Sequence, residues 1–290
     1  MKKAMLLLIP SRPAGIPSTA ENSNDRMSVA QKEWPVRGRF LMPRISKSNE
    51  SPRDAQALSG GVALVTGASR GIGRAIAHQL ALLGASVSIC GRDRATLKDS
   101  ASELAALGVP VHNQIADVTN SVAVFDMIAQ TEAALGPITI LVNNAGIGLF
   151  GPVHEKTEAD WDRVLDTNLK SVFLVSRAVA PSMIRRGSGD IINISSLAGR
   201  NTFAGGGIYC ASKWGLVGLS GCMAEDLREF GIRVSVICPG SVATEFSGRG
   251  PKDTSKVLTA EDVAHAVKAI VTQGPQSFLS EIHLRPRRKP

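Results

Sequence analysis

The sequence contains few cysteines and histidines, and this scarcity argues against two classes of protein. There are four cysteines in 290 residues, none in a C-x-x-C pair, and five scattered histidines. A disulfide framework or a Cys/His metal centre needs several such residues at short, regular spacing. We therefore predict free thiols, a reducing cytoplasmic location and no metal site.

The sequence also lacks a long hydrophobic run, which argues against a membrane protein. No apolar stretch approaches the roughly 18 residues of a membrane-spanning helix. The short apolar start at residues 4–9 ends at Pro10 and is shorter than the core of a secretory signal. Residues 1–55 are rich in serine and proline and show no periodicity, so we expect a disordered extension. A targeting segment and an over-long gene start are the alternatives.

An excess of one charge sign is missing from the body of the chain, although the net charge is +8. Residues 1–55 hold ten basic and five acidic residues, and residues 285–290 hold four basic residues. The intervening residues 56–284 hold 19 basic and 20 acidic residues. A nucleic-acid-binding domain carries its basic residues clustered in the folded body. We therefore expect neither nucleic acid nor a membrane surface as a partner.

From residue 60 onward, short apolar runs alternate with longer amphipathic stretches. The runs, which we expect to be strands, are residues 62–66, 86–90, 111–116, 138–143, 190–195, 232–238 and 281–284. The stretches, which we expect to be helices, are residues 72–83, 94–107, 121–135, 157–186, 208–230 and 260–272. Apolar strands that alternate with helices are typical of a parallel sheet covered on both faces. The pattern predicts an α/β fold of the Rossmann type: one doubly wound domain over residues 56–284 with a seven-stranded parallel sheet, then a basic tail at 285–290.

A glycine-rich turn joins the first expected strand to the first expected helix. It reads T-G-A-S-R-G-I-G over residues 66–73, with the spacing G-x-x-x-G-x-G. Such glycines permit close approach of the backbone to a pyrophosphate, and the helix start offers free N–H groups to the anion. A purely structural glycine turn is the alternative. We expect a dinucleotide cofactor, bound by Gly67, Ser69, Arg70, Gly71, Ile72 and Gly73.

The residues after the second strand bear on the choice between NAD(H) and NADP(H). Selectivity for NAD calls for a carboxylate that accepts hydrogen bonds from the ribose hydroxyls. Here Cys90 is followed by Gly91, Arg92 and Asp93, and a guanidinium can bind a 2′-phosphate in a bidentate manner. Arg70 is a second candidate for that phosphate, whereas we expect Asp93 to cap the next helix. NADP(H) is therefore favoured over NAD(H).

The single tyrosine of the chain, Tyr209, is followed four residues later by Lys213. In a helix the two side chains project from one face. A phenol is a poor acid or base at neutral pH, but a nearby ammonium group favours the phenolate and lowers the phenol pKa. Ser196 follows the fifth expected strand, at the rim of the ligand crevice, and its hydroxyl can stabilise a developing charge. Ser195 is its rival for this role.

From about residue 60 to residue 284, the sequence resembles the short-chain dehydrogenase/reductase family, in its 3-oxoacyl-[acyl-carrier-protein] reductase-like branch. The matching motifs follow the order of the family: T-G-A-S-R-G-I-G at 66–73, Asp117-Val118, N-N-A-G at 143–146, Asn168 in D-T-N-L, Ser196, Tyr209-x-x-x-Lys213 and Pro239-Gly240. The stretch 281–286 departs from the glycine-rich ending of many members of this branch. That departure puts an assignment to fatty-acid synthesis in doubt.

The resemblance implies a role for each matching residue. Tyr209 would be the general acid in reduction and the general base in oxidation, and Lys213 would hold the nicotinamide ribose and lower the tyrosine pKa. Ser196 would orient the carbonyl, and Asn168, which the residues alone indicate to be a helix-interior amide, would hold a water in the proton relay. The other implied cofactor contacts are Asp117 and Val118 at the adenine, Asn144 and Ala145 at the adenosine ribose, Val242 and Thr244 over the nicotinamide carboxamide, and Gly146, Pro239 and Gly240 in the same motifs.

The predicted function is therefore that of an NADP(H)-dependent oxidoreductase that reduces a ketone, with a 3-oxoacyl thioester as one candidate, to a secondary alcohol. An NAD-dependent dehydrogenase of a sugar, steroid or other secondary alcohol is the alternative, and a nucleotide-sensing regulator without chemistry is a remote one. We expect substrate specificity to come from residues 198–208 and from a lid at 241–259. Arg200 would attract an anionic substrate or be a solvated loop charge. The resemblance implies a homodimer or homotetramer.

Overall fold

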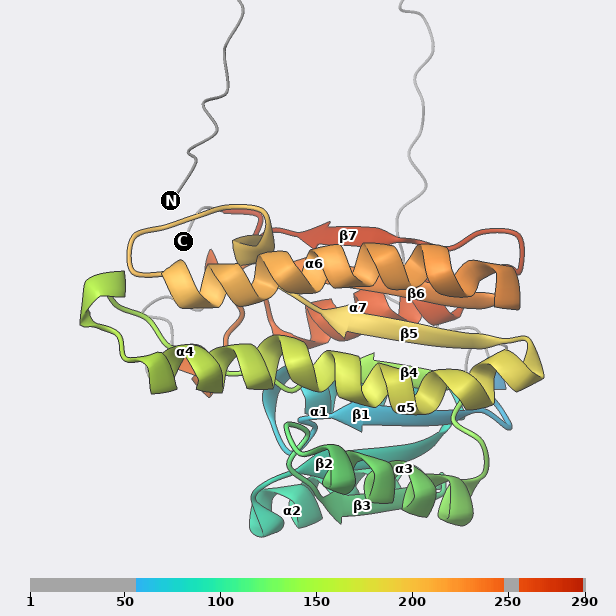
Figure 1. The fold of residues 1–290 in the computed structure, drawn as a ribbon. Coiled ribbons are helices and arrows are strands. Elements are labelled where there is room, and N and C mark those ends of the chain that lie inside the picture. The colour runs from blue at the N-terminus through green and yellow to red at the C-terminus, as the bar shows by residue number, and fades with distance from the viewer. Residues whose placement is uncertain (1–55, 248–255, 289–290) are drawn as a thin grey trace, which may run out of the picture. The chain divides into compact units, whose positions relative to one another are not determined.

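Seven short parallel strands form the sheet that carries the site. They are β1 (Val62–Thr66), β2 (Ser86–Gly91), β3 (Val111–Ile115), β4 (Ile140–Asn143), β5 (Gly189–Ile194), β6 (Ile232–Pro239) and β7 (Glu281–Leu284). Their order in the sheet is β3-β2-β1-β4-β5-β6-β7, and every neighbouring pair runs parallel (Figure 1). The strand order reverses between β1 and β4, which is where a doubly wound sheet binds its ligands. The predicted Rossmann-type fold is confirmed.

The structure is a computed structural model and describes residues 56–247 and 256–288. The extension predicted at residues 1–55 lies outside the described residues. Residues 248–255 of the expected lid and the end of the basic tail also lie outside them. Within the described ranges, no helix is long and apolar enough to cross a membrane.

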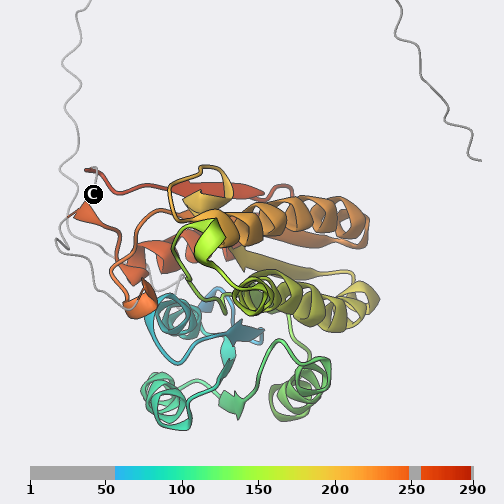
Figure 2. The same cartoon turned by 60° about the vertical axis from the view of Figure 1, so that its left-hand side comes forward.

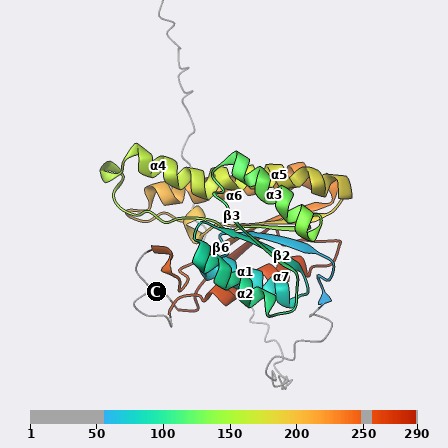
Figure 3. The ribbon, with the colours of Figure 1, turned by 90° about the horizontal axis from the view of Figure 1, so that it is seen from below.

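Helices cover both faces of the sheet and bury a separate apolar core on each. The three helices of one layer are α1 (Gly71–Leu82), α2 (Arg94–Ala105) and α7 (Ala260–Val271). The four helices of the other layer are α3 (Ser121–Leu135), α4 (Glu158–Leu165), α5 (Ser171–Arg186) and α6 (Gly207–Leu227) (Figure 2 and Figure 3). Ile76 and Val267 are fully buried in the first core, and Met127 and Val179 are fully buried in the second. Burial of each such side chain contributes about 1.5–3 kcal/mol.

The segment predicted as one helix over residues 157–186 is interrupted, and the prediction of a single helix is wrong. After α4, residues Asp166–Lys170 form a π-helical turn, and α5 begins at Ser171. A π turn inserts an extra residue into the helical repeat, and such turns are frequent at functional sites. Here it carries Asn168, whose side chain is fully buried. The extra residue aims that amide at the end of β4.

Candidate active site

The carboxyl ends of β4, β5 and β6 face the N-terminal part of α6, and most candidate catalytic residues meet there. Tyr209 and Lys213 lie one turn apart on α6, and both side chains are buried. The Lys213 Nζ atom is 5.9 Å from the centroid of the Tyr209 ring. Nζ donates a hydrogen bond to the Ile194 carbonyl at the end of β5, at 2.9 Å. The helix thus delivers an ammonium group to the tyrosine, as the spacing of four residues predicts.

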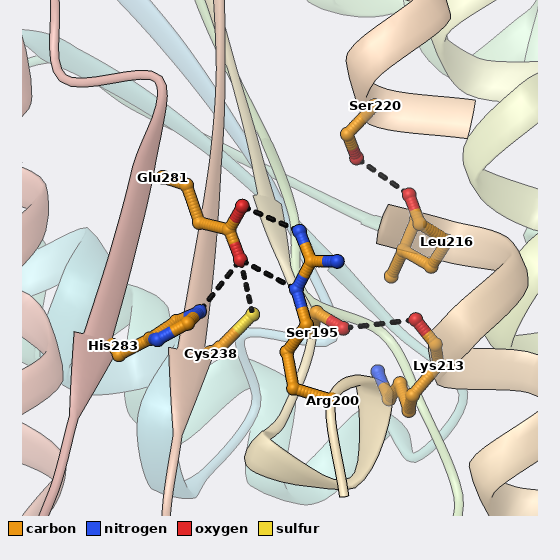
Figure 4. Close-up of polar contacts among 8 residues, drawn as sticks. All are labelled: Ser195, Arg200, Lys213, Leu216, Ser220, Cys238, Glu281 and His283. Carbon is orange, nitrogen blue, oxygen red and sulfur yellow. Dashed lines mark hydrogen bonds and ion pairs between the residues drawn. The ribbon is translucent and has the colours of Figure 1, made fainter. Parts of the chain in front are cut away.

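The two adjacent serines after β5 have different partners. The Ser195 hydroxyl donates to the Lys213 carbonyl at 3.2 Å and thereby holds α6 to the sheet (Figure 4). The Ser196 hydroxyl accepts from the Ala198 N–H at 3.1 Å and lies beside the phenol, where it lowers the pKa of Tyr209. The Ser196 hydroxyl lies next to the phenol and donates only at 3.5 Å, to the Pro239 carbonyl, whereas the Ser195 hydroxyl donates at 3.2 Å to the Lys213 carbonyl. The geometry favours Ser196 over Ser195 as the substrate-orienting residue.

Burial has the largest effect on the pKa values of Tyr209 and Lys213, whereas the sequence predicted that their mutual attraction would dominate. Burial raises the pKa of Tyr209 to about 12, and the neighbouring Ser196 opposes this only in part. Burial also lowers the pKa of Lys213 to about 8. The expected depression of the phenol pKa by the ammonium group is therefore not observed. The phenol keeps its proton at neutral pH.

The amide of Asn168 fixes the backbone that follows β4. Its Nδ2 atom donates to the Ile147 carbonyl at 2.9 Å and to the Ser212 hydroxyl at 3.0 Å. Its Oδ1 atom accepts from the Ile147 N–H at 2.8 Å. A Cβ at Gly146 would lie 3.3 Å from Oδ1 and 3.8 Å from the Lys213 Nζ atom, so this backbone passes close to both polar groups. Asn168 therefore links the π turn, the β4 loop and α6 next to the catalytic pair.

The glycine-rich turn leaves the start of α1 open to an anion. Arg70 at the N-cap makes no side-chain hydrogen bond to the helix, and the first turn contains no acidic residue. By contrast, Asp93 caps α2, as predicted, by accepting from the Thr96 N–H at 2.8 Å. The uncapped N–H groups of α1, together with the positive end of the helix dipole, fit a pyrophosphate. The turn thus fits the phosphates of a dinucleotide.

The packing of the turn explains why glycine is required at two of its positions. A Cβ at Gly73 would overlap the Gly67 carbonyl and the Asn144 Nδ2 atom. These two groups are hydrogen-bonded to each other, with Nδ2 donating at 3.1 Å. A Cβ at Gly67, where φ is +64°, would lie 2.8 Å from the Ala145 Cα atom. Asn144 and Ala145 therefore pack against the glycine-rich turn and stabilise it, in addition to the role expected for them at the adenosine ribose.

The two arginines expected at the 2′-phosphate have different environments. Arg70 makes an ion pair with Glu245, with an N–O distance of 2.9 Å, and both side chains are exposed. Arg92 is exposed beyond β2, and its charge lowers the pKa of Asp117, after the larger effect of the Thr119 N–H group. Asp117 itself accepts from the Thr119 N–H in a turn, at 2.9 Å. Arg70 is thus held by Glu245, whereas no ion pair joins Arg92 to another residue in the described part of the chain.

The remaining predicted cofactor contacts lie along the same rim. Val118 is buried in the core between β3 and α3, and half-buried Ile72 packs against the other core. Half-buried Ser69 contacts Gly91, where a Cβ would lie 3.3 Å from the Ser69 Oγ atom. Beyond Pro239, the last residue of β6, the Gly240 N–H donates to the Leu284 carbonyl at 2.9 Å, and Val242 pairs with Leu258. A methyl group of Thr244 lies 3.4 Å from the place of a Cβ at Gly71, so this loop reaches the glycine turn.

Arg200 is an exposed loop charge, as one of the two expectations had it, but it is paired with a carboxylate. Its guanidinium binds the Glu281 carboxylate in a bidentate manner, with N–O distances of 2.8 and 2.5 Å (Figure 4). His283 approaches the same carboxylate, with 2.6 Å between Nε2 and Oε1, and the buried Cys238 thiol lies 4.0 Å from that oxygen. The pair joins the end of the Ser196 loop to the edge strand β7. The Arg200 charge is thus compensated and does not face a substrate as a free cation.

Sequence reasoning missed a group of buried polar side chains beneath the site. The Asn143 amide donates to the Ser176 hydroxyl at 3.0 Å and to the Asn193 carbonyl at 2.8 Å, and Asn193 donates to the Ser220 hydroxyl at 2.9 Å. These bonds join α5, β4, β5 and α6. The asparagine between Ile192 and Ile194, in an expected buried strand, is the signal that could have revealed them, because buried amides require partners. They hold the elements that carry Lys213 and Ser196 in register.

The two parts of the rim have complementary chemistry: the α1 side fits a dinucleotide phosphate, and the α6 side holds a proton donor. This division defines a nucleotide-dependent oxidoreductase. The sequence model of the family described as short chain dehydrogenase matches residues 61–254. The chain belongs to the short-chain dehydrogenase family, whose members act on CH–OH groups with a nicotinamide cofactor.

Several known proteins are similar to this chain. Gluconate 5-dehydrogenase of Gluconobacter oxydans (strain 621H) is 42% identical over 196 residues, which are 68% of this chain and 77% of that protein. A putative ketoacyl reductase of the granaticin polyketide synthase of Streptomyces violaceoruber is 40% identical over 65% of this chain and 70% of that protein. The crystal structure of a metagenomic short-chain oxidoreductase in complex with NADP is 43% identical, with a TM-score of 0.72 over 80% of this chain and 100% of that chain. These relatives differ in their named substrates, so the family membership does not specify the substrate.

Proposed function

We propose that the protein is an NADP(H)-dependent reductase that converts a ketone to a secondary alcohol. The observation that carries this proposal is the buried Tyr209–Lys213 pair opposite the uncapped start of α1. A ketoacyl reductase among the relatives makes 3-oxoacyl thioesters one substrate class to test. A regulator without chemistry would have no use for a phenol and an ammonium group buried together at considerable desolvation cost.

The proposed mechanism follows from the protonation states of the site. When bound, the reduced nicotinamide supplies the hydride. Ser196 donates a hydrogen bond to the carbonyl oxygen and stabilises the negative charge that develops there. Tyr209 transfers its proton to that oxygen, and the Lys213 ammonium group stabilises the phenolate that results. Asn168 fixes the backbone next to Lys213 through its hydrogen bonds to Ile147 and Ser212.

The protonation of Lys213 predicts a pH dependence. Because the pKa of Lys213 is about 8 in the cofactor-free protein, the ammonium group is present below that pH and lost above it. We expect kcat/KM for NADPH, which reports the free enzyme, to be level at lower pH and to fall as pH rises through about 8. Tyr209, with a pKa of about 12, stays protonated across this range.

The Tyr209→Phe variant provides the control for this profile. Its affinity for NADPH, measured by fluorescence titration, should show the same pH dependence as the wild type, because the lysine and not the tyrosine titrates. A wild-type profile that stayed level well above pH 8 would contradict the role given to Lys213.

The preference for NADP(H) is proposed to depend mainly on Arg92, because Arg70 is held by Glu245. A charge-assisted contact to a phosphate contributes about 1.5–3 kcal/mol, which corresponds to roughly tenfold to a hundredfold in affinity. We expect Arg92→Ala to raise KM for NADPH by that factor and to leave KM for NADH unchanged. Steady-state titration with both nucleotides measures this.

Arg177→Ala is the matched control, because Arg177 is an exposed arginine on α5, in the other helical layer. It should change neither constant. If Arg92→Ala raised both KM values equally, Arg92 would not recognise the 2′-phosphate, and the alternative of an NAD-dependent dehydrogenase would gain support.

We also propose that the protein is a homo-oligomer. Phe173 on α5 and Trp214 on α6 are exposed on the outer side of their layer, next to a hollow lined by Leu165, Leu169 and Leu219. Large exposed apolar side chains that gather on one face mark an interaction surface.

All four cysteines are free thiols, three of them buried, which supports the proposed cytoplasmic location.

A further inference from the structure

Three phenylalanines gather around the catalytic tyrosine. The chain contains only eight phenylalanines and one tyrosine. The centroids of the Phe150 and Phe246 rings lie 5.4 and 5.9 Å from that of Tyr209, both edge-on, and the Phe203 ring lies 6.0 Å from Phe150. We call Phe150, Phe203 and Phe246 the aromatic wall. It surrounds the residue that donates the proton.

The aromatic wall stays accessible despite these contacts. Phe150 is 40% exposed, Phe203 is 49% exposed and Phe246 is 42% exposed, whereas Tyr209 is only 8% exposed. An isolated exposed phenylalanine needs no explanation, but Phe150 and Phe246 both contact Tyr209 and Phe203 contacts Phe150, so that the three rings form an apolar surface available to a ligand. Val153, at 66% exposed, extends the apolar surface, because its methyl group reaches the backbone at the start of α6.

The wall is built by three separate loops, two of which are joined by a hydrogen bond. Phe150 follows β4, Phe203 precedes α6, and Phe246 follows β6. The Gly151 N–H donates to the Gly205 carbonyl at 2.8 Å, which joins the first two loops. This bond fixes the positions of Phe150 and Phe203 relative to each other before any substrate arrives.

Glycines let the rings approach the backbone closely. A Cβ at residue 148 would lie 2.7 Å from the Phe246 ring and 2.8 Å from the Phe150 ring. A Cβ at residue 206 would lie 2.6 Å from the Phe203 ring. Any larger residue at Gly148 or Gly206 would displace a ring. The wall is therefore a preorganised surface, which lowers the entropic cost of binding a rigid ligand.

The ring–ring contacts of the aromatic wall offer no hydrogen-bonding group to a sugar acid, although the Lys156 Nζ atom approaches Gly151, next to Phe150, where a Cβ would lie 2.7 Å from it. A polyhydroxylated substrate buries several hydroxyl groups, each of which costs about 1–3 kcal/mol when it finds no partner. The nearby cation Arg200, which could have attracted a carboxylate, is bound to Glu281 in a bidentate manner. An aryl group, by contrast, packs against phenylalanine rings in edge-to-face or offset arrangements.

We propose that the site takes a carbonyl substrate with an apolar aromatic group next to the reacting carbon, and that Phe150, Phe203 and Phe246 bind that group. This inference rests on the proposed function and narrows it to a substrate class. It places the chain apart from the gluconate dehydrogenase to which it is similar. Phe203, the most exposed of the three rings, becomes a specificity-determining residue.

The test compares three alcohols oxidised with NADP⁺: 1-phenylethanol, 2-butanol and gluconate. Burial of a phenyl ring contributes about 1.5–3 kcal/mol, so kcat/KM for 1-phenylethanol should exceed that for 2-butanol by roughly tenfold to a hundredfold. Gluconate should be the poorest substrate of the three. A value of kcat/KM for gluconate equal to or above that for 1-phenylethanol would overturn the inference and leave the proposed function standing.

The Phe203→Ala variant should lose most of the preference for 1-phenylethanol over 2-butanol, chiefly through a higher KM for 1-phenylethanol. Phe203→Leu keeps the apolar area and should give an intermediate result. Phe125→Ala, at an exposed phenylalanine on α3, is the matched control and should change nothing. An equal loss with both alcohols in Phe203→Ala and Phe203→Leu would overturn the role of the wall. No oxidation of any of the three alcohols by wild type that binds NADP⁺ would overturn the inference, and the proposed function fails with it only if 3-oxoacyl thioesters are not reduced with NADPH either.

Discussion

Replacing Tyr209 with phenylalanine is expected to lower kcat for ketone reduction by roughly a thousandfold, the usual contribution of a positioned general acid. The substitution removes one hydroxyl and keeps the ring that packs against Phe150 and Phe246. Because the phenol pKa is about 12, this hydroxyl carries its proton at neutral pH and is the only phenol in the chain. The measurement is the rate of NADPH consumption with a ketone at saturating concentrations.

Two further measurements make the Tyr209→Phe result interpretable. The unfolding temperature should stay within a few degrees of the wild type, since the packing is unchanged, and NADPH affinity at neutral pH should be retained. A variant that folds, binds NADPH and keeps wild-type kcat would sink the proposed mechanism. The Ser196→Ala variant tests the same proton transfer by removing the hydroxyl that is proposed to bind the substrate oxygen.

Replacing Gly73 with alanine is expected to abolish cofactor binding at normal concentrations and to destabilise the domain. The added methyl group would overlap the Gly67 carbonyl and the Asn144 amide and would break the hydrogen bond between them. Overpacking of this kind costs about 1–3 kcal/mol, and the lost bond costs about 1 kcal/mol more. We expect an unfolding temperature lower by roughly 10 °C. Displacement of the turn by about 1 Å should raise the Kd for NADPH about a hundredfold.

Gly274→Ala is the matched control for this substitution. Gly274 lies after α7, and a Cβ there would have no heavy atom within 4 Å. The same chemical change should therefore alter neither the unfolding temperature nor NADPH binding, measured by thermal scan and fluorescence titration. Wild-type affinity in folded Gly73→Ala protein would show that the turn does not form the phosphate site.

The fold and the two halves of the site could be predicted from the sequence because their signals are local. Apolar runs such as residues 62–66 and 232–238 indicate buried strands, and the glycine turn lies between the first strand and the first helix. Tyr209 and Lys213 are placed together by the helical repeat alone. The cap at Asp93 likewise depends on residues three positions apart.

The features that could not be predicted depend on contacts between distant segments. Glu245 reaches Arg70 across 175 positions, and Glu281 reaches Arg200 across 81, so no pattern near either arginine reveals its partner. The π turn at residues 166–170 could not be predicted, because apolar residues continue on both sides of it and leave the helical pattern intact. The pKa shifts at the active site depend on how completely the folded chain excludes water.

Because Tyr209 is the single tyrosine of the chain, its ionisation can be measured directly. A phenol changes its near-ultraviolet absorbance when it ionises, and in most proteins many tyrosines contribute to that signal together. Here the chain contains no other tyrosine, so the whole phenolate signal comes from Tyr209, the proposed proton donor. Binding of a nucleotide or an inhibitor next to Tyr209 can therefore be followed as a shift in one optical titration, without a label or a substitution.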